Sequence, residues 1–296
     1  MPSSRSFVND TDIALAARLA REAGELLLDL RAEQVPSGDA RQLGAAGDRR
    51  SHEYLVRTLA EQRPGDVVMS EEGADDARRR AADRVWIVDP LDGTNEYGEG
   101  RSDWAVHVGL WQRTDTAGSD QPADGGDLVA GAVALPGRSV TLSGDPALRS
   151  VTAHPDGLDI GDAADRADPP STQRPWRIAV SRSRAPAVAR QVAEVLPVEL
   201  VPLGSAGYKI VSVVLGEVDA YLHAGGQYEW DSAAPVAIAR AAGLHASRID
   251  GSPLRYNAAD PYLPDLLVAR PEVASAVLDA CCTPGSRPVS AVPRST

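Results

Sequence analysis

Amphipathic patterning in the first third of the chain predicts two helices. Asp10 and Thr11 can cap a helix that runs to about Arg31. Its apolar residues form the stripe of an amphipathic helix: Ile13, Leu15, Leu19, Leu26, Leu27 and Leu30. Residues 32–47 carry Pro and Gly without periodicity and predict a loop. A second helix is expected over 48–61, with Asp48 at its N-cap position.

Short apolar runs then predict strands. In the first half of the chain they cover 66–69, 84–88, 104–111, 128–135 and 138–142. Residues 114–127 are rich in Asp, Gly and Thr and predict an exposed hairpin loop. The second half alternates strands with helices, in the order 176–180, 185–195, 198–202, 205–216, 218–222, 231–243, 246–249, 265–269 and 271–281, where 246–249 and 265–269 are consecutive strands.

This order of elements predicts an α/β protein in two parts. Alternating strands and helices are typical of an α/β layer, whereas grouped strands indicate an α+β arrangement. Residues 143–174, rich in Asp, Ala and Pro, hold the boundary between the parts. We therefore expect an α+β half over 1–174, an α/β half over 175–283 and a disordered tail over 284–296.

Composition narrows the class of protein. The chain has 296 residues, enough to bury a large core as one or two domains. A net charge of −12 argues against non-specific binding to nucleic acid or to a membrane surface. No apolar run reaches the ~18 residues of a membrane span, and the first residues lack a signal-peptide pattern. We expect a cytoplasmic protein whose adjacent cysteines, Cys281 and Cys282, stay reduced.

A pair of carboxylates at the end of one predicted strand is the main candidate for chemistry. Asp89 and Asp92 close the apolar run that begins at Val85, and a Gly-Thr pair stops it. The Leu91 carbonyl between them can face the same point. Mg²⁺ prefers such hard oxygen ligands. Taken alone, the same residues are also compatible with two ordinary turns after a strand.

Further acidic residues make the metal interpretation stronger. Glu71 and Glu72 follow the strand at 66–69, and Asp231 follows Trp230 far along the chain. The string Asp-Pro-Leu-Asp-Gly-Thr at 89–94, with Trp-Asp-Ser-Ala-Ala-Pro at 230–235, resembles the inositol monophosphatase superfamily of Mg²⁺-dependent, lithium-sensitive phosphatases. The resemblance extends over roughly residues 10–283.

The resemblance implies a fold, a cofactor and a mechanism. The fold is the sugar-phosphatase αβαβα sandwich, and the reaction is metal-assisted hydrolysis of a phosphomonoester by two to three Mg²⁺ ions. The implied metal ligands are Glu71, Asp89, the Leu91 carbonyl, Asp92 and Asp231. The implied catalytic residues, which position the attacking water, are Asp48, Glu71 and Thr94. The amides of Gly93 and Thr94 would hold the phosphate, as helix N-termini do; Glu72 would lie outside the ligand shell and Trp230 would pack.

Two further strings bear on the substrate. Gly-Ser-Ala-Gly-Tyr-Lys at 204–209 contains Lys209, the single lysine among 30 basic residues, and resembles the bisphosphate nucleotidase branch of the superfamily. The segment 92–100 resembles the same branch, although Asn95 departs from its usual Lys or Arg. That branch removes the 3′-phosphate of 3′-phosphoadenosine 5′-phosphate (PAP) during sulfate assimilation. The implied partner is thus a small phosphorylated nucleotide.

The expected substrate contacts come from both halves of the chain: Gly93, Thr94, Ser181, Arg182, Ser205, Lys209, His223 and Asp231. Ser181 and Arg182 are equally compatible with a polar loop that caps a helix. His52, His107, His154 and His245 show no ligand spacing and are interpreted as structural. An inositol phosphate or fructose 1,6-bisphosphate substrate, a metal-binding regulator without catalysis, and a homodimer are left open.

Overall fold

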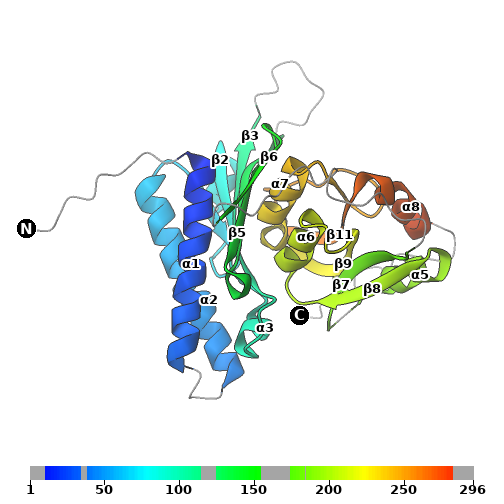
Figure 1. Cartoon of the computed structure of the whole chain (residues 1–296). Helices are drawn as coiled ribbons and strands as arrows, with labels where there is room; N and C mark the ends of the chain where they lie inside the picture. Colours follow the sequence, from blue (N-terminus) through cyan, green and yellow to red (C-terminus); the bar gives the residue numbers. More distant parts are fainter. Residues whose placement is uncertain (1–10, 35–38, 115–124, 155–173, 184, 283–296) are drawn as a thin grey trace, which may run out of the picture.

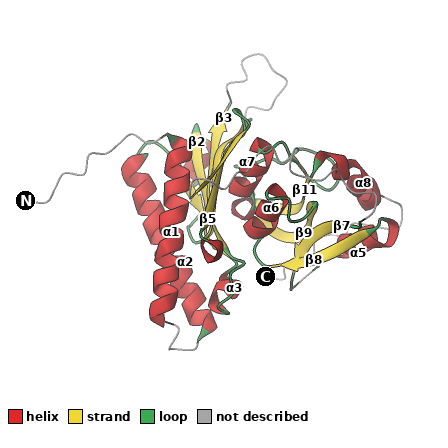
Figure 2. Cartoon of the chain, viewed as in Figure 1, coloured by secondary structure: helices red, strands yellow, loops and turns green. Residues whose placement is uncertain are grey.

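The protein is built in five layers. The computed structural model describes residues 11–34, 39–114, 125–154, 174–183 and 185–282. Figure 1 shows two long helices, a sheet, a central pair of helices, a second sheet and an outer pair of helices in that order. Figure 2 shows the same alternation of helical and strand layers. The expected αβαβα sandwich is therefore confirmed.

The first sheet carries the acidic motif. Its strand order is β1-β2-β3-β4-β5-β6, and β1 and β2 are parallel while the other neighbours are antiparallel. The bounds are β1 Val67–Ser70, β2 Arg84–Asp92, β3 Ala105–Arg113, β4 Gly126–Leu135, β5 Val140–Asp145 and β6 Ser150–His154. Helices α1 (Asp12–Gln34) and α2 (Ala40–Gln62) cover one face and bury Trp86 and Val88 of β2.

The central layer packs against the other face of this sheet. It consists of α6 (Ala206–Val214) and α7 (Ala233–Ala241). A Cβ added at Gly131 of β4 would meet the Ala234 carbonyl oxygen at 2.4 Å, so α7 lies almost in contact with the backbone of the sheet. This close approach brings the segment before α7, which contains Asp231, to the end of β2.

The second sheet has the strand order β10-β11-β9-β7-β8. Strand β7 is parallel to β8 and β9, whereas β11 is antiparallel to both of its neighbours. The bounds are β7 Trp176–Ser181, β8 Val198–Leu203, β9 Ala220–Tyr228, β10 His245–Ser247 and β11 Tyr262–Ala269, with α5 at Ala187–Val195 and α8 at Pro271–Cys282. Helices α5 and α8 cover its outer face and close a separate apolar core.

The expected loop over residues 32–47 is wrong at 32–34 and 40–47, which are helical, while residues 35–38 lie outside the described residues. Helix α1 continues to Gln34, and α2 already begins at Ala40 with Asp39 as its N-cap. Asp48 therefore lies in the middle of α2 and does not cap it. The Gly-Ala-Ala-Gly stretch at 44–47 has low helix propensity in part, but Gly44 and Gly47 are buried against neighbouring elements. Tertiary packing outweighs intrinsic propensity here.

A second difference concerns the helix expected over 231–243: α7 spans Ala233–Ala241, and Asp231 lies outside it. It ends a 3-10 turn over Glu229–Asp231, and Ser232 precedes the helix. A 3-10 turn also occupies Pro136–Arg138, before β5. The expected hairpin between β3 and β4 is present as an antiparallel pair, while residues 115–124 and the tail from 283 lie outside the described residues. The domain division at 174 stays a prediction.

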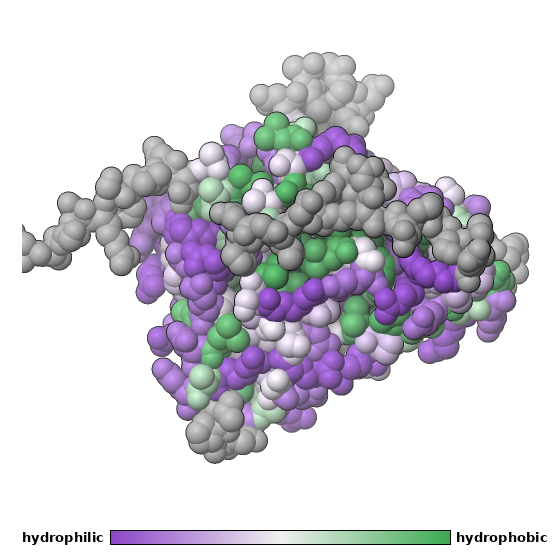
Figure 3. Space-filling view, viewed as in Figure 1, coloured by the Kyte–Doolittle hydropathy of each residue, from purple (hydrophilic) through white to green (hydrophobic). Residues whose placement is uncertain are grey.

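The hydropathy of the outer helix faces agrees with this layering. The outward faces of α1 and α2, at the left of Figure 3, are largely hydrophilic because their apolar faces pack on the sheet. None of the helices in the described ranges is both long and apolar enough to cross a membrane.

Candidate active site

The site is organised by the end of strand β2. Asp89 and Asp92 are buried, with 1% and 7% of their surface exposed. The register between β2 and β3 is irregular between these two residues, and such a bulge re-aims side chains at a strand end. The Leu91 amide donates to Oδ1 of Asp89 over 3.1 Å, and the Ser51 hydroxyl donates to the Pro90 carbonyl over 2.7 Å. These bonds fix the turn that carries both carboxylates.

Glu71 and Asp231 approach this strand end from two other elements. Glu71 directly follows β1, the parallel neighbour of β2, and its carboxyl group faces that of Asp89. Asp231 lies in the turn before α7, where its Oδ2 accepts the Tyr228 amide over 2.7 Å. The structure thus brings together carboxylates from both halves of the chain.

Asp48 reaches the same place from α2. The Thr94 hydroxyl lies 3.2 Å from Oδ1 of Asp48 and 3.2 Å from the Leu91 carbonyl oxygen. A Cβ at Gly44 would meet Cγ2 of Thr94 at 2.7 Å, so glycine allows α2 to pass close to the turn. Asp48, the Leu91 carbonyl and Thr94 therefore share one small volume.

Most of these carboxyl groups have raised pKa values. Burial, together with Glu72, raises the pKa of Asp48 to about 7. Burial and the neighbouring Asp92 carboxylate raise the pKa of Asp231 to about 7. Although Glu71 is exposed as a whole residue, partial burial of its carboxyl and the acidic groups around it raise its pKa to about 7. The pKa of Asp89 lies well above its ordinary value, because the group is buried and faces Glu71.

Asp92 behaves differently from its neighbours. Burial alone would raise its pKa, but His107, the Gly207 amide and Lys209 outweigh burial, and the pKa is lowered. The Ala206 amide donates to Oδ1 over 3.2 Å and the Gly207 amide donates to Oδ2 over 2.6 Å. Asp92 is therefore held in its charged form at the beginning of α6.

This set of groups fits a hard divalent cation. The raised pKa values of Asp48, Glu71, Asp89 and Asp231 arise first from burial and then from repulsion by neighbouring carboxylates. The donors are carboxylate and carbonyl oxygens, which Mg²⁺ prefers over other ligand types. A cation bound among them would remove the repulsion and favour the charged forms.

The residues expected to bind the substrate lie around this cluster. Gly93 adopts a left-handed φ of 93°, and a Cβ there would meet Cβ of Ser205 at 3.1 Å. Ser205 caps α6 by accepting the Tyr208 amide. Lys209 is not on an exposed helix face: it is 3% exposed, donates to the Gly204 carbonyl and lies over the Tyr221 ring. Burial lowers the pKa of Lys209 to about 8.

The other expected contacts are engaged within the protein. Arg182, just after β7, pairs with Glu96 over 2.9 Å and with Glu99 over 3.1 Å. Ser181 ends the same strand. His223 lies on β9, where its Nε2 is 3.1 Å from the Gly225 carbonyl oxygen. Arg182 thereby links β7 to the short helix α3 (Thr94–Gly98) that begins with Thr94.

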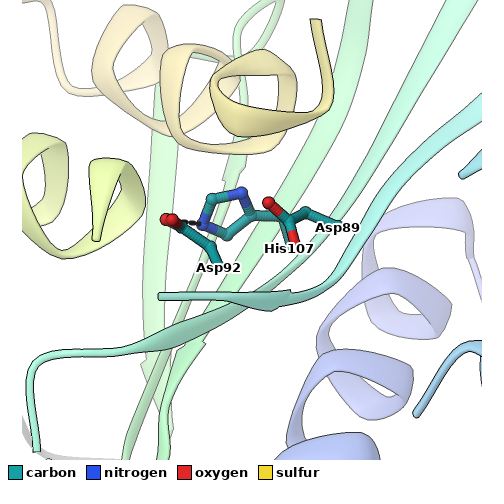
Figure 4. A group of neighbouring side chains, drawn as sticks. All are labelled: Asp89, Asp92 and His107. Carbon is teal, nitrogen blue, oxygen red and sulfur yellow. Dashed lines mark ion pairs between the residues drawn. The ribbon is translucent and has the colours of Figure 1, made fainter. Parts of the chain in front are cut away.

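His107 is the residue that the sequence pattern missed. The sequence predicts a structural histidine, whereas Figure 4 shows its ring pointing toward Asp92, with Asp89 beside it. Its Nε2 lies 3.1 Å from Oδ2 of Asp92. Burial disfavours the charged ring, but Asp92 outweighs burial and the pKa of His107 is raised. Only the pairing of β2 with β3, which sets His107 opposite Asp89, could have revealed this neighbour.

Comparisons with known proteins point to the same family as the sequence motifs. The sequence model of the inositol monophosphatase family matches residues 8–280. A protein of Mycobacterium leprae named 3′-phosphoadenosine 5′-phosphate phosphatase is 50% identical over 270 residues, which cover 90% of this chain and 92% of that protein. The 3′(2′),5′-bisphosphate nucleotidase CysQ of Escherichia coli is 26% identical, over 83% of this chain and 94% of its own.

Solved structures with the same architecture include CysQ from Bacteroides thetaiotaomicron, described as a bacterial member of the inositol monophosphatase family. It matches with a TM-score of 0.66 and 30% identity, over 86% of this chain and 96% of that one. An inositol monophosphatase from Anabaena matches with a TM-score of 0.70 over 94% and 97% of the two chains, but at 19% identity it shows the fold alone.

Proposed function

The chain belongs to the inositol monophosphatase family, and we propose that it is a Mg²⁺-dependent phosphatase that converts PAP to AMP by removing the 3′-phosphate. One observation carries the reaction class: five carboxylates from both halves of the chain meet at the end of β2. The substrate is supported by the mycobacterial relatives named as PAP phosphatases, which share half of their aligned residues with this chain.

The metal would be held by oxygen ligands of the first sheet and of the turn before α7. The proposed ligands are Glu71, Asp89, the Leu91 carbonyl, Asp92 and Asp231, for two to three ions. Bound Mg²⁺ would acidify a coordinated water and neutralise charge on the phosphate. The proposal is supported by the burial of Asp89 and Asp92 and by the mutual repulsion of the carboxyl groups around them.

Asp48 and Thr94 would orient the attacking water. Their contact places a carboxylate and a hydroxyl beside the Leu91 carbonyl, a proposed metal ligand. The pKa of Asp48 is about 7 in the metal-free protein, and with Mg²⁺ bound nearby its carboxylate would stay charged and could accept a proton from the water. Glu71, which is also a proposed metal ligand, would share this task. No Ser, Cys or His nucleophile is required by this mechanism.

The nucleotide would lie between the first sheet and the second half of the chain. Gly93 and Thr94 would present backbone amides to the phosphate that is cleaved. Asp231 would face the leaving 3′-oxygen, and Ser205 and Lys209 would contact the phosphate that remains. Ser181, Arg182 and His223 complete the proposed contacts. Arg182 can contact the nucleotide only by sharing or leaving its ion pairs with Glu96 and Glu99.

Product identity tests the proposed reaction. Incubation of the purified protein with PAP and Mg²⁺ is expected to release inorganic phosphate and 5′-AMP in equal amounts, as followed by ³¹P NMR and chromatography. Formation of 3′-AMP would mean that the other phosphate is attacked. No reaction with any Mg²⁺ concentration would favour a metal-binding regulator. The cytoplasmic location and a homodimer stay predictions.

A further inference from the structure

His107 is a buried polar residue that the proposed mechanism does not yet use. None of its surface is exposed, and its Cα lies opposite Asp89 in the pairing of β2 with β3. Burying an imidazole is unfavourable unless its nitrogens have partners. Its surroundings therefore indicate what the ring does.

The two ring nitrogens face different halves of the protein. Nδ1 lies 3.1 Å from the carbonyl oxygen of Trp230, the residue before Asp231. A carbonyl oxygen only accepts, so Nδ1 carries the hydrogen and donates it. Nε2 lies 3.1 Å from Oδ2 of Asp92 (Figure 4), and because a carboxylate also only accepts, the two form an ion pair in which Nε2 carries a hydrogen as well. One rigid ring thus spans from the turn of Asp231 to the carboxylate of Asp92.

The His107 ring also leaves no room for a side chain at the neighbouring position 207. A Cβ at Gly207 would meet Nε2 of His107 at 2.0 Å, which no side chain can tolerate without displacing the ring. The Gly207 amide meanwhile donates to the same Oδ2 of Asp92 over 2.6 Å. The Asp92 carboxylate therefore lies between His107 and the first residues of α6 and contacts both.

We propose that His107 is a positioning residue of the metal site. It holds the Asp92 carboxylate from β3 and, through the Trp230 carbonyl, ties Asp92 to the turn that presents Asp231. Two carboxylates that arise from different halves of the chain thereby keep the separation that a common cation requires. Groups that orient metal ligands in this way commonly change metal affinity when they are replaced. The inference rests on the metal site in the proposed function.

Two substitutions separate the two contacts of the ring. In His107→Gln the amide nitrogen can take the place of Nε2 beside Asp92, whereas in His107→Asn it can take the place of Nδ1 beside Trp230. Val133→Ala is the matched control, because Val133 is buried on β4 directly opposite His107 in the sheet. Gly207→Ala provides a fourth variant, which leaves His107 in the chain but pushes its ring away.

The measurement is Mn²⁺ binding to the metal-free protein, followed by electron paramagnetic resonance without any substrate. His107→Asn and Gly207→Ala are expected to weaken Mn²⁺ binding by about 10- to 100-fold. His107→Gln should stay within a few-fold of the unchanged protein, and Val133→Ala should lower the melting temperature without changing Mn²⁺ affinity. Saturating Mg²⁺ should leave the KM for PAP in His107→Asn near its original value.

Other results would overturn the role of His107. Unchanged affinity in His107→Asn, or equal losses in the Asn, Gln and Val133→Ala variants, would show that the ring only fills space. Asp89, Asp92 and His107 have ligand atoms within 4.8 Å of one another, so a strong ¹⁴N coupling to bound Mn²⁺ would instead make His107 a direct ligand. If the unchanged protein binds no Mn²⁺, the metal site and the role of His107 fail together.

Discussion

Thr94 Oγ1 lies 3.2 Å from Oδ1 of Asp48, across the interface between α3 and α2. The same hydroxyl is 3.2 Å from the Leu91 carbonyl oxygen. A hydroxyl has one proton, which is shared between two acceptors here, and its lone pairs stay available for a water molecule. The two residues therefore form one unit next to the proposed metal ligands.

We expect this unit to act as a whole in catalysis. Asp48→Asn and Thr94→Ala should each lower kcat for PAP by about 10²- to 10⁴-fold, the usual range for the loss of a positioned acid or base group. The double variant should be little worse than the poorer single variant, because the effects of residues that act together do not add. Steady-state kinetics at saturating Mg²⁺ would measure this.

Thr94→Ser is the control for these three variants, because it keeps the hydroxyl and should retain most of the activity. If the two single losses multiply in the double variant, Asp48 and Thr94 act independently and their contact has no role in positioning the water.

Asp92→Asn and Asp231→Asn should each reduce turnover on the order of 10²-fold or more. Each substitution removes a charge from the proposed metal site, and even groups outside the ligand shell cost 10- to 100-fold when lost. Circular dichroism should show an intact fold. Asp127→Asn is the control, because Asp127 is an exposed carboxylate on β4 that pairs with Arg240. Normal turnover of both variants at saturating Mg²⁺ would contradict the assignment.

The stability of the metal-free protein should depend on pH in a specific direction. Asp48, Glu71 and Asp231 have pKa values of about 7 in the folded protein. In the unfolded chain, carboxyl groups have pKa values of about 4. The folded state therefore binds more protons between these values, and its stability falls as the pH rises through this window.

Melting temperatures at about pH 5.5 and pH 8 would test this. With a chelator present, we expect the protein to melt at a lower temperature at the higher pH. Because Mg²⁺ binds the charged carboxylates, it should raise the melting temperature more at pH 8 than at pH 5.5. A Mg²⁺ effect that is equal at both values would mean that these groups do not lie together around a cation.

Lys209 is expected to determine the choice of substrate. A contact from its ammonium to the phosphate that is not cleaved is worth roughly 1.5–3 kcal/mol, so Lys209→Ala should lower kcat/KM for PAP by about 10- to 150-fold. Inositol 1-phosphate lacks that second phosphate, and its hydrolysis should change only a few-fold. Lys209→Arg should recover part of the loss, because a planar guanidinium does not reproduce a compact ammonium.

The position of Lys209 also allows a different role, which the same kinetics would reveal. Its buried ammonium is close enough to lower the pKa of Asp92, so it is a candidate support for the metal site as well. If Lys209→Ala lowers kcat/KM equally for PAP and for inositol 1-phosphate, Lys209 supports the metal site and does not determine the choice of substrate.

The local motif was predictable, but much of its surroundings was not. The apolar run of β2 and the carboxylates at its end follow from residue type and order, whereas the place of Asp231 in the site was implied by the family resemblance. The first turns of α2 could not be predicted, because Gly44 and Gly47 suggest a loop until their contacts with Thr94 and Leu91 are known. The neighbourhood of His107 depends on strand register and on the approach of α6, neither of which leaves a local pattern.

Phosphate release from three substrates in parallel is the most direct test of the central claim. PAP, inositol 1-phosphate and fructose 1,6-bisphosphate would be compared with the same enzyme preparation, with Mg²⁺ and with a chelator. We predict Mg²⁺-dependent release with the highest kcat/KM on PAP and none in the chelator. A higher kcat/KM on inositol 1-phosphate or fructose 1,6-bisphosphate, or release from PAP that does not need a metal, would contradict the account.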